Sequence, residues 1–270
     1  MSYPGVVQGE PLASGRVARF WHLAVALRRG LWLLRRTQSA NERTSLPAKL
    51  ALLDQLRGYL MPEYVLSDYA KLWFEDEQFF ETYHRLMPSS PQTAERKFFL
   101  RELLRLVTDL DGDTAEAGVF TGASSWFICA SRQGRRSAHW AFDSFQGISS
   151  PAAPDGTFWR VGDLRVGSQV ARAVLKDFDA RVLEGWIPAV FAEAQIERLV
   201  FAHIDVDLYE PTLASMEFFY PLVVPGGVVV CDDYGSAITP GATRAVDDYM
   251  AGRPEPVIHA PTGQGIIIRR

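Results

Sequence analysis

Cysteine is scarce in this chain of 270 residues, which has only Cys129 and Cys231, far apart and without the spacing of metal ligands. This scarcity argues against a disulfide framework and against a zinc site. We expect both thiols to be unpaired and buried, because a free cysteine packs as a small apolar side chain. The same observation predicts a reducing compartment, the cytoplasm.

Long apolar runs are also missing. No stretch reaches the roughly 20 apolar residues that span a bilayer. Residues 1–15 lack the basic-then-apolar order of a signal peptide. The net charge of −4 gives no reason to expect a nucleic-acid partner, and there is no internal repeat or low-complexity tract. What is present, 47% hydrophobic and 22% charged residues, predicts a folded chain with a large core.

Charge is distributed unevenly along the chain. Residues 1–50 carry eight basic and two acidic side chains, a net +6 against −10 for the remainder. Within them, residues 17–34 mix large apolar side chains with arginines. A helix lying at a membrane surface is one interpretation. We favour the other, a helix packed on a partner subunit or on the main domain.

The first 110 residues have a helical pattern from residue 16 onward. Apolar positions recur at three- and four-residue spacings over 46–60, 73–86 and 93–110. Prolines separate these segments, and a hydroxyl side chain could cap the last one. The prolines and the cap candidates are Pro62, Pro88, Pro91, Ser90 and Thr93.

After residue 113 short apolar runs alternate with helical stretches. This alternation predicts a mostly parallel sheet, with ligands at the carboxyl ends of its strands. A hairpin at the end of the chain adds one antiparallel strand at or near an edge. The predicted strands cover 114–120, 139–143, 180–183, 199–207, 227–232, 257–260 and 265–268, and the later helices cover 211–222 and 242–251.

The first strand ends in a glycine-containing turn, E-x-G-x-x-x-G, from Glu116 through Gly118 to Gly122. Glycines let the backbone approach a ligand closely, and the helix that follows offers free N–H groups. A pyrophosphate site would have G-x-G-x-x-G instead. Glu116 would repel a phosphate but suits the ammonium group of a methionine-derived cofactor. A purely structural turn is the alternative interpretation.

The second strand ends at Asp143 and Ser144. A carboxylate at this place can accept hydrogen bonds from ribose hydroxyls, as in nucleotide-binding α/β folds. The alternative is a turn or a helix cap made by either residue. Together with the first turn, the pattern predicts a nucleoside cofactor.

Four aspartates follow the fourth and fifth strands, Asp205 and Asp207 after one and Asp232 and Asp233 after the other. Alternation along a strand predicts that Asp205 and Asp207 point the same way. Converging carboxylates repel unless a cation or protons intervene, and oxygen ligands select Mg²⁺, Ca²⁺ or Mn²⁺. Such an ion would lower the pKa of a substrate hydroxyl, and a spare carboxylate could take the proton. Helix caps and turns are the alternative for each single residue.

The last 155 or so residues resemble the macrocin O-methyltransferase family, whose members methylate sugar hydroxyls on macrolide and aminocoumarin antibiotics. The most specific part is the run D-x-D-x-Y-x-x-T, Y-P, P-G-G and D-D-Y. The segments that carry the resemblance are AEAGVFTGASS (115–125), AFDSFQGI (141–148), GDL (162–164), LEGWIP (183–188), HIDVDLYEPTLASMEFFYPLVVPGGVVVCDDYG (203–235) and RAVDDY (244–249).

The resemblance implies a Rossmann-like class I methyltransferase fold, with a mostly parallel seven-stranded sheet, helices on both faces and a helical N-terminal extension. It also implies S-adenosylmethionine and Mg²⁺ as cofactors. By motif, Asp205, Asp232 and Asp233 hold the metal and Asp207 is the general base. The implied cofactor residues are Glu116, Gly118, Gly122, Ser124, Asp143, Ser144 and Trp186.

The resemblance also divides the chain. Residues 93–270 form the methyltransferase domain, and residues 1–92, which match poorly, contribute to the acceptor pocket and to homo-oligomer contacts. Asp163 lies where relatives have a mobile segment over the site. Val206 replaces a frequent glycine, but we expect it to face away from the site. The stretch 166–184 is compressed against relatives, so the adenine contacts are not assigned.

The predicted reaction is methyl transfer to a hydroxyl of a sugar on a small glycosylated natural product. A surface or lipid-linked glycan, favoured slightly by the basic N-terminus, and a phenol or catechol are alternative acceptors. A non-catalytic nucleoside-binding homologue is the alternative from another class, and the four intact aspartates argue against it. A nucleotide-sugar or NAD enzyme is disfavoured by the missing phosphate-type glycine pattern.

Overall fold

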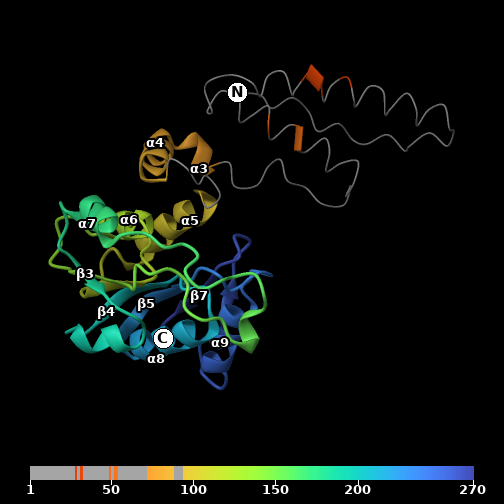
Figure 1. Cartoon of the computed structure of the whole chain (residues 1–270). Coiled ribbons are helices and arrows are strands. Elements are labelled where there is room, and N and C mark those ends of the chain that lie inside the picture. The colour runs from red at the N-terminus through yellow and green to blue at the C-terminus, as the bar shows by residue number, and fades with distance from the viewer. Residues whose placement is uncertain (1–27, 29–30, 33–48, 50–51, 54–71, 88–93) are drawn as a thin grey trace. The chain divides into compact units, whose positions relative to one another are not determined.

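The structure is a computed structural model that describes residues 28, 31–32, 49, 52–53, 72–87 and 94–270 (Figure 1). The chain divides into two compact units, Met1–Glu75 and Asp76–Arg270. The first unit includes the short helix α3, Leu72–Glu75. The amphipathic segment 17–34, the helix over 46–60 and the two cap candidates lie wholly or largely outside the described residues. A domain boundary between residues 92 and 93 stays a prediction.

The helix expected over 73–86 is interrupted at Asp76, where α3 ends and α4, Glu77–Leu86, begins. The Asp76 carboxylate accepts a hydrogen bond from the Phe79 amide at 2.9 Å, which makes it the N-cap of α4. Phe79 is buried and stacks on Phe127, with ring centroids 5.2 Å apart. Helix α4 is therefore packed against α6 (Ala123–Ser131) within the second unit.

The second unit contains a seven-stranded sheet in the order β3-β2-β1-β4-β5-β7-β6. The first five strands are parallel, and β7 runs antiparallel between β5 and β6. This confirms the mostly parallel sheet with a terminal hairpin. The strands are β1 (Asp113–Ala117), β2 (His139–Asp143), β3 (Ala180–Glu184), β4 (Leu199–Ile204), β5 (Val223–Cys231), β6 (Ile258–His259) and β7 (Gly265–Ile268).

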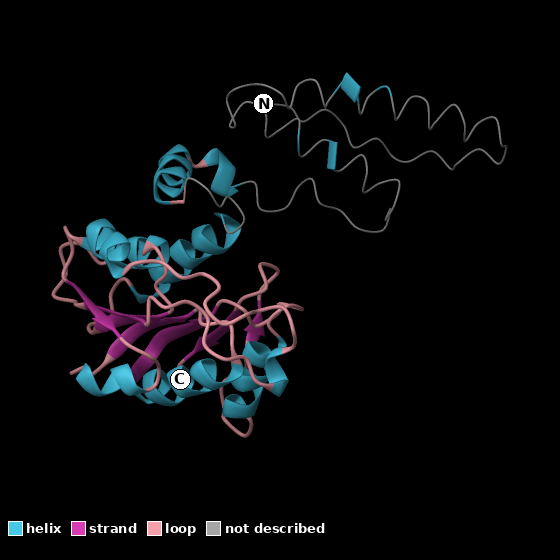
Figure 2. Cartoon of the chain, viewed as in Figure 1, coloured by secondary structure: helices cyan, strands magenta, loops and turns pink. Residues whose placement is uncertain are grey.

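Helices cover both faces of the sheet (Figure 2). On one face lie α5 (Ala94–Leu104), α6 (Ala123–Ser131) and α7 (Ser168–Leu175), and on the other lie α8 (Tyr209–Phe219) and α9 (Pro240–Met250). Short 3-10 turns complete the second unit at Arg105–Val107, Ala153–Asp155, Ala189–Glu193 and Tyr220–Leu222. Among the described residues no helix is long and apolar enough to cross a bilayer.

The strands are apolar on both sides because both faces are covered. Val228 and Val230 of β5 pack with Leu100 of α5, whereas Val229 and Cys231 face the core that contains Met216 of α8. Side chains alternate between the faces of a strand, so one run of valines serves two cores. Both cysteines are free and buried, as expected.

Two strands end three residues earlier than the sequence predicted. β1 ends at Ala117 instead of Phe120, and β4 ends at Ile204 instead of Asp207. Beyond these ends the backbone becomes left-handed, with φ of +86° at Gly118 and +63° at Asp207. The apolar pattern continues past the strand ends because Val119 is still buried and Gly118 and residues 205–207 are half-buried. The chain therefore leaves the sheet where the candidate site begins.

Candidate active site

A cavity of about 260 Å³ opens at the carboxyl ends of β1, β2 and β4. This is the edge of the sheet at which a parallel α/β fold places its ligands. Seven of the residues predicted from the sequence line it: Gly118, Ser124, Asp143, Ser144, Trp186, Asp205 and Asp207. The other predicted residues, Glu116, Gly122, Asp232 and Asp233, are not part of the lining.

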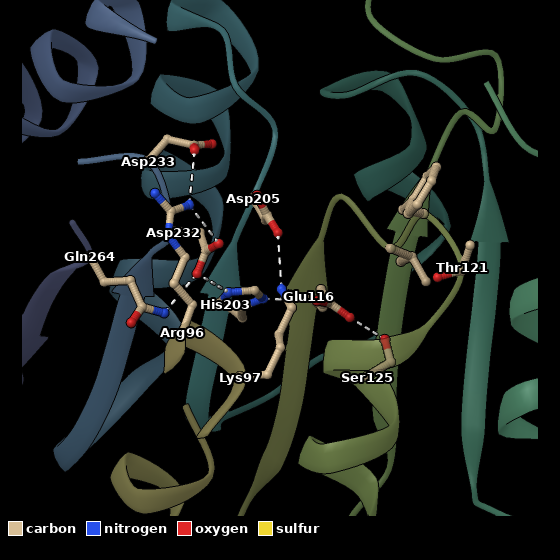
Figure 3. Close-up of polar contacts among 12 residues, drawn as sticks. Arg96, Lys97, Glu116, Thr121, Ser125, His203, Asp205, Asp232, Asp233 and Gln264 are labelled. Atoms are coloured by element: carbon tan, nitrogen blue, oxygen red, sulfur yellow. Dashed lines mark hydrogen bonds and ion pairs between the residues drawn. The ribbon is translucent and has the colours of Figure 1, made fainter. Parts of the chain in front are cut away.

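Glu116 is buried on β1 (Figure 3) and is not part of the cavity lining. Its Oε1 lies 2.8 Å from Nδ1 of His203, and its Oε2 accepts a hydrogen bond from the Ser125 hydroxyl. Both oxygens are therefore engaged within the protein. A direct contact between Glu116 and a cofactor stays a prediction, and the observed geometry makes Glu116 a support for His203 and Ser125.

His203 was missed by the sequence analysis, although the register contains the signal for it. Glu116 of β1 and His203 of β4 are paired across neighbouring parallel strands and are both buried. Nε2 of His203 lies 3.3 Å from Oδ1 of Asp232, which also accepts from Gln264 at 2.7 Å. Burial alone would lower the pKa of His203, but Asp232 and Glu116 raise it to about 10. The imidazolium thus joins two acids.

The same buried chain of hydrogen bonds continues toward β2. The Ser125 hydroxyl lies 3.0 Å from Nε2 of His139, and the Thr114 hydroxyl lies 2.9 Å from Nδ1. Burial lowers the pKa of His139 to about 4. Of the two histidines in this chain of hydrogen bonds, His203 is therefore charged near neutral pH and His139 is neutral.

The turn after β1 depends on Gly118 and Asp143. A Cβ added to Gly118 would lie 1.9 Å from the carbonyl oxygen of Asp205, so only glycine fits there. The Asp143 carboxylate accepts hydrogen bonds from the amides of Val119 and Phe120, each at 2.8 Å, and from Phe145 at 2.7 Å. Asp143 holds the turn in place, and its contact with a ribose stays a prediction.

The four aspartates come together as the sequence predicted, and their charges act on one another. Burial raises the pKa of Asp207 to about 9, with further contributions from Asp233, Asp205 and Asp232. Burial and neighbouring carboxylates also raise the pKa of Asp233 to about 7. The pKa of Asp232 is lowered: burial opposes this, but Lys97 and His203 outweigh it.

Two cations on the first turn of α5 face this cluster (Figure 3). Nη1 of Arg96 lies 3.1 Å from Oδ2 of Asp232 and 3.4 Å from Oδ1 of Asp233. Nζ of Lys97 lies 3.5 Å from Oδ2 of Asp205. The sequence analysis missed both, because a charged pair on a helix is typical of a solvated surface.

The donor set fits a divalent cation. Oδ2 of Asp233 is buried and has no hydrogen-bond partner, which is costly for a carboxylate. Asp205, Asp232 and His203 each offer a ligand atom within 4.8 Å of the others. Both nitrogens of His203 are already engaged by acids, so the carboxylate oxygens are the better ligands for a hard ion.

One expectation about this cluster is wrong. Val206 was expected to face away from the site, but it lines the cavity next to Asp205 and Asp207. The expectation assumed strand alternation through residue 207. Because β4 ends at Ile204, that alternation does not extend to these residues. Asp205 and Asp207 share the cavity because of the turn.

The mouth of the cavity is apolar. Phe120, Leu164 and Trp186 line it with exposed fractions of 37%, 47% and 46%. Leu164 belongs to the predicted GDL segment and has a φ of +60°. The Asp163 carboxylate accepts from the Arg160 amide at 2.9 Å, which closes the loop that carries Leu164. This mouth suits a ligand with a flat or apolar part.

Sequence comparison agrees with this arrangement. The model of the macrocin O-methyltransferase (TylF) family matches residues 95–263, which contain strands β1 to β6 and all four aspartates. The chain belongs to this family. Its fold is accordingly a class I methyltransferase fold, as a solved relative also shows: the O-methyltransferase NovP is 27% identical, with a TM-score of 0.54 over 64% of this chain and 79% of NovP.

Two curated relatives are similar in sequence to the present chain. The demethyldecarbamoylnovobiocin O-methyltransferase of Streptomyces niveus is 32% identical over 167 residues. The 8-demethyl-8-(2,3-dimethoxy-alpha-L-rhamnosyl)-tetracenomycin-C 4′-O-methyltransferase of Streptomyces olivaceus is 32% identical over 159 residues. In both cases the match covers 53% of this chain and 60% of the relative.

Proposed function

We propose that this protein transfers a methyl group from S-adenosylmethionine to a hydroxyl of a sugar on a glycosylated natural product, with Mg²⁺. The observation that carries the proposal is the position of Asp207. This carboxylate lines the cavity, has a raised pKa and stands beside three further aspartates, one of which has an unpartnered buried oxygen. Family membership supplies the reaction class.

In this proposal the cavity divides between two ligands. Gly118, Ser124, Ser144 and Trp186 border the part that would hold the cofactor. Asp205, Asp232 and Asp233 would hold the metal. When bound, S-adenosylmethionine supplies an electrophilic methyl group and the cation supplies a Lewis acid for the acceptor oxygen.

Asp207 takes the proton of the acceptor hydroxyl in this mechanism. A general base is most effective when its pKa lies near the working pH, and burial among acids brings the pKa of Asp207 up to about 9. Additional positive charge at the cluster would bring the pKa down again. Positioning of the hydroxyl beside Asp207 then accounts for much of the rate enhancement.

The acceptor class rests on the relatives and on the apolar mouth. The relatives' names describe methylation of a novobiocin precursor and of a rhamnosyl tetracenomycin. An aglycone with an apolar part would suit Phe120 and Leu164 at the mouth of the cavity. A phenolic acceptor fits the same mouth and is the second candidate.

The test is transfer of a labelled methyl group from S-adenosylmethionine to matched pairs of glycosides and their aglycones. Methylation of the glycoside alone, lost with a chelator and restored by Mg²⁺, is expected. Methylation of the aglycone alone would favour the phenolic acceptor. Full activity in excess chelator would remove the metal from the proposal. Cofactor binding without turnover on any acceptor would support a non-catalytic homologue.

Localisation and assembly belong to the same proposal. Two free, buried thiols are consistent with a reducing compartment such as the cytoplasm. A homo-oligomer is expected from the resemblance, and sedimentation velocity would test it.

A further inference from the structure

Lys97 stands out among the polar residues that the proposed reaction does not use. It is 6% exposed, although a lysine is almost never buried without a partner. Its Nζ lies 3.5 Å from Oδ2 of Asp205, and the residue also lines the cavity. The ammonium group therefore lies at the acidic cluster, and Lys97 borders the same cavity as Asp205 and Asp207.

Lys97 differs from Arg96, its neighbour on α5. The Arg96 guanidinium has three acceptors, the Thr262 carbonyl oxygen and one oxygen each of Asp232 and Asp233. It is thus tied to the end of β5 and to the turn between β6 and β7. Lys97 instead contacts Asp205, at the end of β4, which is one of the proposed metal ligands. The two cations serve different parts of the cluster.

The Lys97 ammonium lies beside a carboxylate that a divalent cation would also need, with its Nζ 3.5 Å from Oδ2 of Asp205 and the residue only 6% exposed. Like charges at such short range in a buried site repel strongly.

We propose that Lys97 is a resident cation of the acidic cluster, which competes with the divalent cation for Asp205 and keeps the metal affinity low. This inference rests on the metal site of the proposed function and adds a determinant of its affinity. In the metal-free protein the ammonium compensates Asp205. When a divalent cation binds, the ammonium must either move into the cavity or stay beside a second positive charge.

The test measures Mn²⁺ binding by electron paramagnetic resonance on the full chain without cofactor. Lys97→Met keeps the length of the side chain and removes its charge. It should bind Mn²⁺ at least tenfold more tightly than the unaltered protein, because the repulsion is gone. Lys97→Arg keeps the charge and should stay within about twofold. The matched control is Lys176→Met, at an exposed lysine that follows α7, and it should leave the affinity unchanged.

Each outcome decides the inference. Equal or weaker binding by Lys97→Met overturns it and leaves the proposed function standing. No Mn²⁺ binding by any of the proteins removes the metal from the proposed function, and the inference fails with it. Circular dichroism establishes that each variant is folded. If Lys97→Met does not fold, Lys97→Gln carries the same expectation and is judged by the same criterion.

Discussion

At the scale of single residues, the site is a problem of charge compensation. Four aspartates and Glu116 meet Arg96, Lys97 and His203 in a largely buried space. Lys97 and His203 lower the pKa of Asp232 against the effect of burial, whereas Asp207 has no cation in contact among the described residues and its pKa rises to about 9. Of these two carboxylates, Asp207 is therefore the one suited to accept a proton.

Asp207→Asn tests the role of this carboxylate as base. The amide has nearly the same shape but cannot accept a proton, so turnover should fall at least a hundredfold. Cofactor affinity should stay within about twofold, because the residues that border the cofactor part of the cavity are unchanged. Methyl-transfer rates and calorimetric titration with S-adenosylhomocysteine measure the two effects. A variant that loses cofactor affinity while keeping its rate at saturation would contradict the assignment.

The raised pKa of Asp207 also predicts a pH dependence of stability. Between about pH 4 and pH 9 the folded protein retains a proton on Asp207 that the unfolded chain has lost. Stability must therefore fall as the pH rises through this range. In chelator at pH 8, Asp207→Asn should be more stable by on the order of 5 kcal/mol. Urea unfolding of both proteins at pH 5 and pH 8 measures this effect. If the variant and the unaltered protein differ in stability by the same amount at both pH values, Asp207 does not have a raised pKa in the folded state.

Asp232→Ala probes the metal. This side chain joins His203, Arg96 and Gln264, so its removal takes one acceptor away from a buried imidazolium, a guanidinium and a buried amide. Activity and its dependence on Mg²⁺ should disappear together, and the free energy of unfolding should fall by about 3 kcal/mol. Mg²⁺ titration of the methyl-transfer rate and urea unfolding measure this. Activity that persists and still responds to Mg²⁺ would show that the ion binds elsewhere.

At the scale of elements, the strand ends determine the site. The apolar runs predicted β2 without error and placed the other strands, because burial on both faces leaves a strong signal. The same signal overran the ends of β1 and β4, since the turns that follow are also partly buried. Left-handed residues such as Phe120 and Asp207 carry no sequence signature, so the turn geometry was not predictable.

Gly118→Ala tests the turn after β1. Its control is Gly134→Ala, because both glycines have a φ of +86° but an added Cβ at Gly134 would meet nothing within 4 Å. Both variants should lose roughly 1–2 kcal/mol from left-handed strain. Only Gly118→Ala forces the Asp205 carbonyl away, and it alone should weaken cofactor binding at least tenfold. Equal cofactor affinity in both variants would mean that the close approach has no functional consequence.

At the scale of the whole molecule, the parts of the candidate site that form short sequence motifs were predictable. The residues that contact those motifs from distant parts of the sequence were not. The four aspartates are consecutive motifs at strand ends. Their partners Arg96, Lys97 and Gln264 lie on α5 and next to β7, and only the fold brings them together. His203 and Glu116 are paired by strand register, which a list of strands does not contain.

The buried chain of hydrogen bonds across the sheet leads us to expect that the stability of the whole molecule depends on pH. His139 is neutral in the folded state because burial lowers its pKa to about 4, whereas an exposed histidine titrates near 6.5. As the pH falls from about 6.5 to 4, the unfolded chain gains a proton that the folded chain cannot take. The contribution of His139 to the free energy of unfolding is therefore fully present above about pH 6.5 and has fallen by on the order of 3 kcal/mol at pH 4.

His139→Gln still offers hydrogen bonds to Thr114 and Ser125 but does not titrate. Urea unfolding between pH 4 and pH 7 should show a shallower acid slope for this variant than for the unaltered protein, whatever its absolute stability, and parallel slopes would mean that His139 is protonated within the fold.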